Sequence, residues 1–178
     1  DALMHKTAQQ ALYPDTTYGK SSGGDPVVMP ELTYEKFKRF HQTFYHPSNA
    51  RAFFSGDDDP AKRLDILDEY FSQFERIEVD AEIGLQGRFN EPRRVEATYA
   101  GTKAEGKPRD GMVTVNWMID PPAGREEALA NGIVSYILMG TPAAPLRKAL
   151  TDSGLGEGLM GGGISSGLRQ PMATFGLK

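Results

Sequence analysis

The chain has 178 residues, a formal net charge of −4 and no cysteine, so disulfides, thiol nucleophiles and cysteine-based zinc sites are excluded. The length suggests one domain or parts of two, and the acidic balance argues against a nucleic-acid-binding face. No apolar run approaches the roughly 18 residues that a membrane-spanning helix needs. We therefore expect neither nucleic acid nor a membrane among its partners.

Two helices separated by a long loop open the chain. A rough helical spacing of apolar residues predicts a helix over residues 1–12, and turn-forming residues predict a loop over 13–30. Thr33 is a suitable N-cap for a helix over residues 34–46. That helix carries an aromatic stripe that we expect to be core, made of Tyr34, Phe37, Phe40 and Phe44.

A short strand and a second amphipathic helix are predicted next. The strand covers residues 49–55, and Asp59 then caps a helix over 60–74 with Pro60 in its first turn. Residues 76–92 are charged and poor in apolar groups, which is typical of a linker. We therefore expect the end of one domain over residues 1–75 and the opening of another over 93–178.

The second half alternates strands and helices less regularly. We predict first a strand over residues 93–99, a hairpin loop over 101–110 and a strand over 112–119. We then predict helices over 125–139 and 144–152, a glycine-rich loop over 154–163 and a strand over 171–177. This order lacks strict βαβ alternation, which favours α+β layers over a doubly wound sheet. Because the chain ends inside a predicted strand, we expect a fragment truncated at both ends.

Two glycine motifs fail the tests of their chemistry. Residues 156–161 fit G-x-G-x-x-G, but a helix precedes them, and Glu157 is the last acidic residue of the chain, so the dinucleotide-binding arrangement is absent. Residues 163–167 fit G-x-S-x-G, but every histidine precedes Ser165, whereas the hydrolase elbow needs its acid and histidine after the serine. Both motifs are interpreted as turns, and Glu157 as a lone exposed carboxylate.

The acidic and histidine clusters also lack the spacing of known metal sites. Residues 57–59 are three aspartates, but the calcium-loop positions that need glycine and glutamate hold Lys62 and Asp68, so a turn and helix cap is expected. His41 and His46 are five residues apart, which places their rings about 140° apart on a helix. His46 is instead expected to interact with the carbonyls at the end of its helix.

Several runs together resemble one family. They are Ala8–Leu12, Thr17–Gly19, Ser22–Pro26, Pro30–Thr33, Phe40–His41, Tyr45–Arg51, Gly56–Pro60, Arg63–Leu64, Val115–Trp117, Gly140–Lys148 and Ser153–Glu157. In their order and spacing they are similar to the presequence protease branch of the pitrilysin-like (M16) zinc metallopeptidases. The resemblance covers most of the chain and is weakest over residues 75–110.

The resemblance implies a large peptidase of four related α+β domains, each with antiparallel sheet packed against helices, that encloses cleaved targeting peptides and other short unfolded peptides. It implies zinc in the full-length enzyme, in the mitochondrial matrix or chloroplast stroma, or in the cytoplasm of a bacterium. The family's H-x-x-E-H motif and later glutamate lie upstream of this chain. No catalytic or metal-binding residue therefore carries over, and the substrate-binding residues are unknown.

This chain would then contribute scaffold and chamber wall, with the remaining domains of the same polypeptide and peptide substrates as partners. We expect the two helices of residues 34–74 to pack under the catalytic sheet, and the loop over 154–163 to be mobile and to face the chamber. The isolated chain would be inactive. The alternatives are a noncatalytic core or partner subunit of a larger complex, which keeps the scaffold without the zinc motif, and an independent binding module.

Overall fold

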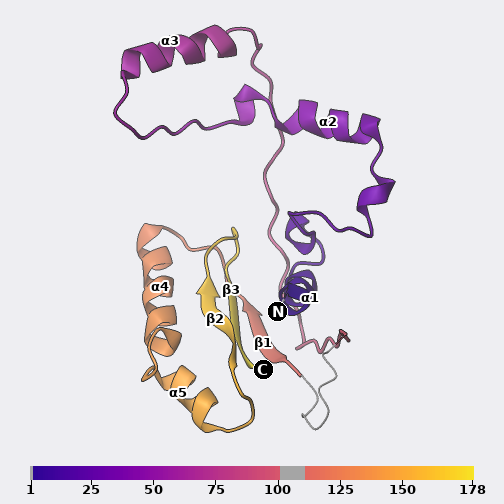
Figure 1. The fold of residues 1–178 in the computed structure, drawn as a ribbon, viewed down its shortest axis with the longest axis vertical. Coiled ribbons are helices and arrows are strands. Elements are labelled where there is room, and N and C mark those ends of the chain that lie inside the picture. The colour runs from indigo at the N-terminus through magenta and orange to yellow at the C-terminus, as the bar shows by residue number, and fades with distance from the viewer. Residues whose placement is uncertain (1, 101–110) are drawn as a thin grey trace. The chain divides into compact units, whose positions relative to one another are not determined.

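The computed structural model describes residues 2–100 and 111–178, and the hairpin loop predicted over 101–110 lies outside them. Within the described residues the fold is α+β, as predicted, with five helices and one three-stranded antiparallel sheet (Figure 1). In chain order the elements are α1 (Ala2–Leu12), α2 (Tyr34–Phe44), α3 (Pro60–Phe71), β1 (Val113–Met118), α4 (Arg125–Met139), α5 (Pro145–Asp152), β2 (Leu159–Ser165) and β3 (Met172–Leu177).

The chain forms two compact units. The sheet unit consists of Asp1–Ser22 and Ile83–Lys178, and the helical unit consists of Gly23–Glu82. The helical unit is therefore an insertion between two parts of the sheet unit. The domains expected from sequence over residues 1–75 and 93–178 stay a prediction.

Local signals account for both helices of the helical unit. The Thr33 hydroxyl accepts a hydrogen bond from the Lys36 backbone N–H at 3.3 Å, which caps α2. The Asp59 carboxylate accepts from the Ala61 N–H at 2.9 Å, and Pro60 occupies the first turn of α3. The predicted helices are thus confirmed, although each ends two or three residues earlier than expected.

Two expectations for the helical unit are wrong. Residues 49–55 form no strand, because they pair with no strand of the described residues. The backbone N–H groups of Asn49 and Ala50 instead donate to carbonyls of the preceding turn. The aromatic stripe of α2 is not core: Phe37 is 56% exposed and Tyr34 is 71% exposed. No residue between Gly23 and Glu82 is buried.

The sheet has the order β1–β3–β2, and both of its pairs are antiparallel. Strand β3 is central, with Phe175 opposite Val115 of β1 and Ala173 opposite Ile164 of β2. The strands predicted over 112–119 and 171–177 are confirmed. The strand predicted over 93–99 is wrong, because those residues do not join the sheet.

The glycine-rich loop predicted over 154–163 is also wrong in its second half, which belongs to β2. The strand accommodates its glycines through an irregularity of register between Met160 and Gly163, as in a β-bulge. Gly161 has a φ of +81°, and a side chain on it would collide with the Thr174 carbonyl. Glycine is needed here both for its backbone conformation and for the close approach of β3.

Helices α4 and α5 confirm the predictions over 125–139 and 144–152, and both contact β2. The Ser135 hydroxyl accepts from the Ile164 backbone N–H at 2.9 Å. The Ser135 side chain of α4 therefore provides a hydrogen-bond acceptor for a backbone N–H of the outer strand β2. The apolar stripe of α4 is largely exposed, at 65% for Leu129 and 51% for Ile133.

The core lies entirely in the sheet unit. Its buried apolar side chains are Ala8, Leu12, Tyr13, Met139, Ala144, Met160 and Ala173, and Pro171 is fully buried with them. Across residues 2–100 and 111–178, none of the helices combines the length and apolarity that crossing a bilayer would require.

Candidate functional site

Four residues from three distant segments of the sheet unit form a polar cluster, which we call the polar clasp: Tyr13, Asp15, Gln86 and Gln170. Three of them are buried, and Asp15 lies at the exposed edge. The Tyr13 hydroxyl donates to the Gln170 carbonyl at 2.7 Å. The Gln86 N–H donates to the Gln170 amide oxygen at 2.6 Å, and the Gln170 amide donates back to the Gln86 carbonyl at 3.1 Å. Asp15 and Gln86 are bonded twice, at 2.9 and 2.6 Å.

The polar clasp is built for rigidity and contains no acid–base pair. Burial raises the pKa of Tyr13 to about 12, with a smaller contribution from Tyr18, so the phenol is neutral near pH 7 and donates its proton to backbone carbonyls. Paired amides of this kind hold segments together, because each buried polar group has a partner. Sequence reasoning missed the clasp, since Gln86 falls in the predicted linker and nothing local marks it.

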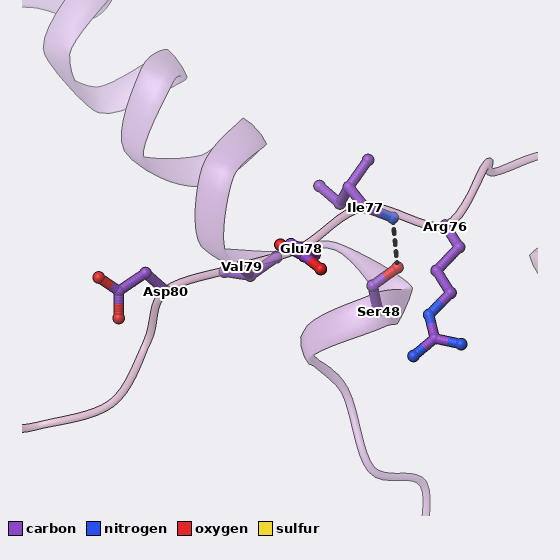
Figure 2. Close-up of a pocket in the computed structure, with 6 residues that line it drawn as sticks. All are labelled: Ser48, Arg76, Ile77, Glu78, Val79 and Asp80. Carbon is purple, nitrogen blue, oxygen red and sulfur yellow. Dashed lines mark hydrogen bonds between the residues drawn. The ribbon is translucent and has the colours of Figure 1, made fainter.

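A groove of about 680 Å³ lies in the helical unit between Ser48 and the extended residues 76–80. The Ser48 hydroxyl accepts from the Ile77 backbone N–H at 3.1 Å (Figure 2). Figure 2 shows Arg76 and Asp80 at opposite ends of this segment, with Glu78 between them. The groove carries charges of both signs, but among the described residues its carboxylates are not part of a group of three or more side chains placed to hold a metal.

A second hollow, of about 310 Å³, lies in the sheet unit between α1 and residues 18–22. We call it the basic cleft. Its lining residues are Ala2, His5, Lys6, Gln9, Gln10, Tyr18, Gly19, Lys20, Ser21 and Ser22. It brings together hydroxyl, amide and cationic groups, and sequence reasoning did not anticipate it.

The three histidines are not assembled into one site. The His41 ring stacks on Tyr45 with centroids 4.9 Å apart, and His46 meets the Phe74 ring edge-on at 5.4 Å. His46 Nδ1 accepts from the Ser48 N–H at 3.2 Å. The expectation that His46 interacts with the carbonyls ending its helix is therefore wrong, because the ring instead caps the next turn. His5 belongs to α1, in the other unit.

The remaining sequence candidates have ordinary structural surroundings. The Asp58 carboxylate accepts from Arg63 Nε at 2.8 Å, and this bond lowers the pKa of Asp58. The aspartates thus form a turn and a helix cap, as predicted. Glu157 is exposed, as predicted, and its backbone N–H donates to the Lys178 carbonyl at 2.8 Å. Ser165 ends β2 and is exposed, so the interpretation of residues 163–167 as a turn is wrong for 163–165, which are strand.

A zinc ion has no fitting ligand set in the part of the chain that the structure describes. There, no group of three or more histidine, cysteine, aspartate or glutamate side chains is placed to hold a metal. Protein zinc sites use three or four such ligands. No step of a zinc-dependent reaction is therefore assigned to these residues.

The chain is similar in sequence to several known proteins. It is 45% identical over 181 residues to presequence protease 1, chloroplastic/mitochondrial, of Arabidopsis thaliana, which covers all of this chain and 17% of the relative. It is 38% identical to protein HypA of Clostridium perfringens, over 90% of this chain and 17% of the relative. It is 37% identical to the mitochondrial presequence protease of Mus musculus, over 88% of this chain and 15% of the relative.

The chain thus spans less than a fifth of the length of these relatives. Residues 31–178 match the family model described as the peptidase M16 inactive domain. That span includes every strand and four of the five helices of the described residues. The chain belongs to the peptidase M16 family and is similar to its presequence proteases.

Proposed function

We propose that this chain is a noncatalytic span of a zinc metalloendopeptidase that degrades cleaved targeting peptides and other short unfolded peptides. The observation that carries the proposal is the 45% identity, over the whole chain, to a protein named presequence protease. The match to the M16 inactive domain supports the noncatalytic role. The names of the plant and mouse relatives favour a mitochondrion or chloroplast as its location. In a bacterium, the corresponding location would be the cytoplasm.

In this proposal the chain supplies scaffold and chamber wall. Zinc and the general base come from the remaining domains of the same polypeptide, since the described residues form no metal-ligand cluster. The exposed apolar side chains of α2 and α4, such as Phe37 and Ile133, are surfaces that those domains would cover. If it stayed uncovered in water, an exposed apolar area of this extent would favour aggregation.

The test is a peptidase assay on the full-length polypeptide, with a fluorogenic targeting peptide as substrate. We expect cleavage that a zinc chelator abolishes and added zinc restores, whereas the 178-residue chain alone is inactive. The upstream reading frame should encode H-x-x-E-H followed by a downstream glutamate. An intact frame without this motif, together with a full-length protein that cleaves nothing, would contradict the proposal and indicate a noncatalytic subunit.

A further inference from the structure

We propose that the basic cleft binds a small oxyanion, in the form of a phosphate or a carboxylate group. The cleft has a lysine on each wall: Lys6 comes from α1, and Lys20 comes from the facing segment. His5 of α1 also lines it. None of its ten described lining residues is acidic, although the chain has 24 acidic residues against 20 lysines and arginines. Among the described lining residues, basic side chains therefore outnumber acidic ones, whereas the reverse holds for the whole sequence.

The wall formed by α1 is one regular helix face. Its lining positions are 2, 5, 6, 9 and 10, the spacing that places side chains on the same side of a helix. The amide of Gln10 and the ring of His5 add hydrogen-bonding groups to this wall. The helix thus presents polar side chains to the cleft at positions 5, 6, 9 and 10, with Ala2 at one end.

The opposite wall is held in place at Tyr18 and Gly19 before any ligand arrives. The Gln9 amide donates to the Tyr18 carbonyl at 2.7 Å, which ties this wall to α1. The Tyr18 hydroxyl accepts from the Arg169 N–H at 2.9 Å, and its ring meets Tyr13 edge-on at 5.8 Å. A side chain on Gly19 would collide with the Tyr13 carbonyl, so this turn packs directly against the polar clasp. A preformed site spends less free energy on ordering when it binds.

The donors that project from this wall match an oxyanion. Lys20 offers an ammonium group, and Ser21 and Ser22 offer hydroxyls within three consecutive residues. Lysine and hydroxyl groups are common ligands of phosphate and carboxylate oxygens. The volume of about 310 Å³ lies at the lower end of the range for small-molecule sites, so the anion is a small molecule or a single charged end of a larger one.

The experiment is an NMR titration of the 178-residue chain with inorganic phosphate and, separately, with acetate. Both are run at constant ionic strength, with chloride as the reference anion, so that general screening is matched. We expect saturable shifts of the amides of residues 5, 10 and 20–22. Saturation by phosphate alone assigns the site to phosphate, and saturation by acetate alone assigns it to a carboxylate.

Substitutions then separate a site from general surface charge. Lys20→Gln should weaken binding about tenfold, the size expected for one charge-assisted hydrogen bond, and Lys20→Arg should retain it. His5→Gln tests the other wall and should also weaken binding. Lys36→Gln, an exposed lysine of the helical unit, is the matched control and should change nothing.

Three results would overturn the proposal: no saturable shift with either anion, identical shifts with chloride, or equal weakening by the Lys20 and Lys36 variants. The chain carries the cleft whether or not its parent polypeptide is a peptidase. This test therefore stands or falls independently of the peptidase assay.

Discussion

The sheet unit and the helical unit are folded by different means. Every buried side chain of the described residues belongs to the sheet unit, whereas no residue between Gly23 and Glu82 is buried. In the sheet unit, the segment that follows α1, the residues around Gln86 and the segment that precedes β3 are held together by hydrogen bonds between residues more than 70 positions apart. The helical unit instead has helix caps and a few contacts over shorter separations, such as the hydrogen bond from Ile77 to Ser48, which spans 29 positions. Regular secondary structure and a packed core are therefore specified by separate features of this sequence.

Local signals are sufficient to define α2 and α3 but contribute little independent stability. Phe40 and Phe44 lie one turn apart with ring centroids at 4.8 Å, and such pairs add only about 0.2–0.5 kcal/mol to a helix. The two helices have 11 and 12 residues. Isolated helices shorter than about 12–15 residues are marginal in water, so these two depend on a surface that packs against them.

Hydrogen exchange should reveal the largest difference between the units. The amides of β3 open only with the whole sheet unit, at a cost of about 5 kcal/mol or more, and should exchange at least about a thousandfold more slowly than those of α2 and α3. Exchange followed by mass spectrometry on the 178-residue chain measures this directly. Similar protection in α3 and β3 would show that the helical unit has a core of its own.

The next largest effect is expected from Gly161→Ala in β2. The φ of +81° and the collision with the Thr174 carbonyl should together cost about 2–4 kcal/mol of unfolding free energy. Gly162→Ala is the matched control, because nothing lies within 4 Å of a side chain at that position. Urea unfolding of both variants measures the difference, and equal stabilities would mean that the bulge is not rigid.

The elements that sequence reasoning placed well are those with a local cause. The cap at Thr33, the proline after Asp59 and the alternation over 112–119 each mark an element that the structure contains. The strand β2 was missed, because its glycines are unfavourable in an isolated strand. Only the pairing with β3 and the contact of Ser135 with Ile164 make a strand there.

The strands expected over 49–55 and 93–99 failed for the opposite reason. Their sequences suit a strand, but a strand also needs a neighbour, and none of the described residues provides one. The basic cleft and the polar clasp could not be predicted, since each joins residues from separate segments. Gln86 and Gln170 lie 84 positions apart and carry no motif.

Tyr13→Phe should produce an intermediate effect, confined to the sheet unit. The change removes a buried donor from the Gln170 carbonyl and should cost about 1–2 kcal/mol of unfolding free energy. Tyr34→Phe, on the exposed stripe of the helical unit, should cost nothing measurable. Thermal unfolding of both variants at pH 7 tests this, and equal losses would remove the distinction between the units.

The pH dependence of the same variant checks the cause. The pKa of Tyr13 is raised from 10.0 to about 12 in the folded chain, so the unfolded chain loses this proton first. The stabilisation is complete below pH 10 and is lost as the pH rises through about 12. The original chain should therefore lose stability more steeply across this interval than Tyr13→Phe does. Parallel curves would show that the phenol is not buried in solution.

Phe37→Ala should have the smallest effect of the series. The side chain is 56% exposed, so we expect a change of no more than about 0.5 kcal/mol in unfolding free energy. Met139→Ala in α4 is the comparison in the sheet unit: that side chain is 7% exposed, and its truncation should cost about 2–5 kcal/mol. Calorimetry on the 178-residue chain measures both changes.

The effect of Phe37→Ala also tests which part of the polypeptide the aromatic stripe of α2 packs against. A near-zero change in the 178-residue chain, with a loss of about 3 kcal/mol or more in the full-length polypeptide, would place the covering surface in the rest of that polypeptide. A large loss already in the 178-residue chain would mean that the stripe is packed within it, as the helical spacing of its aromatic residues first suggested. The two proteins together thus separate an intrinsic core from a docking face.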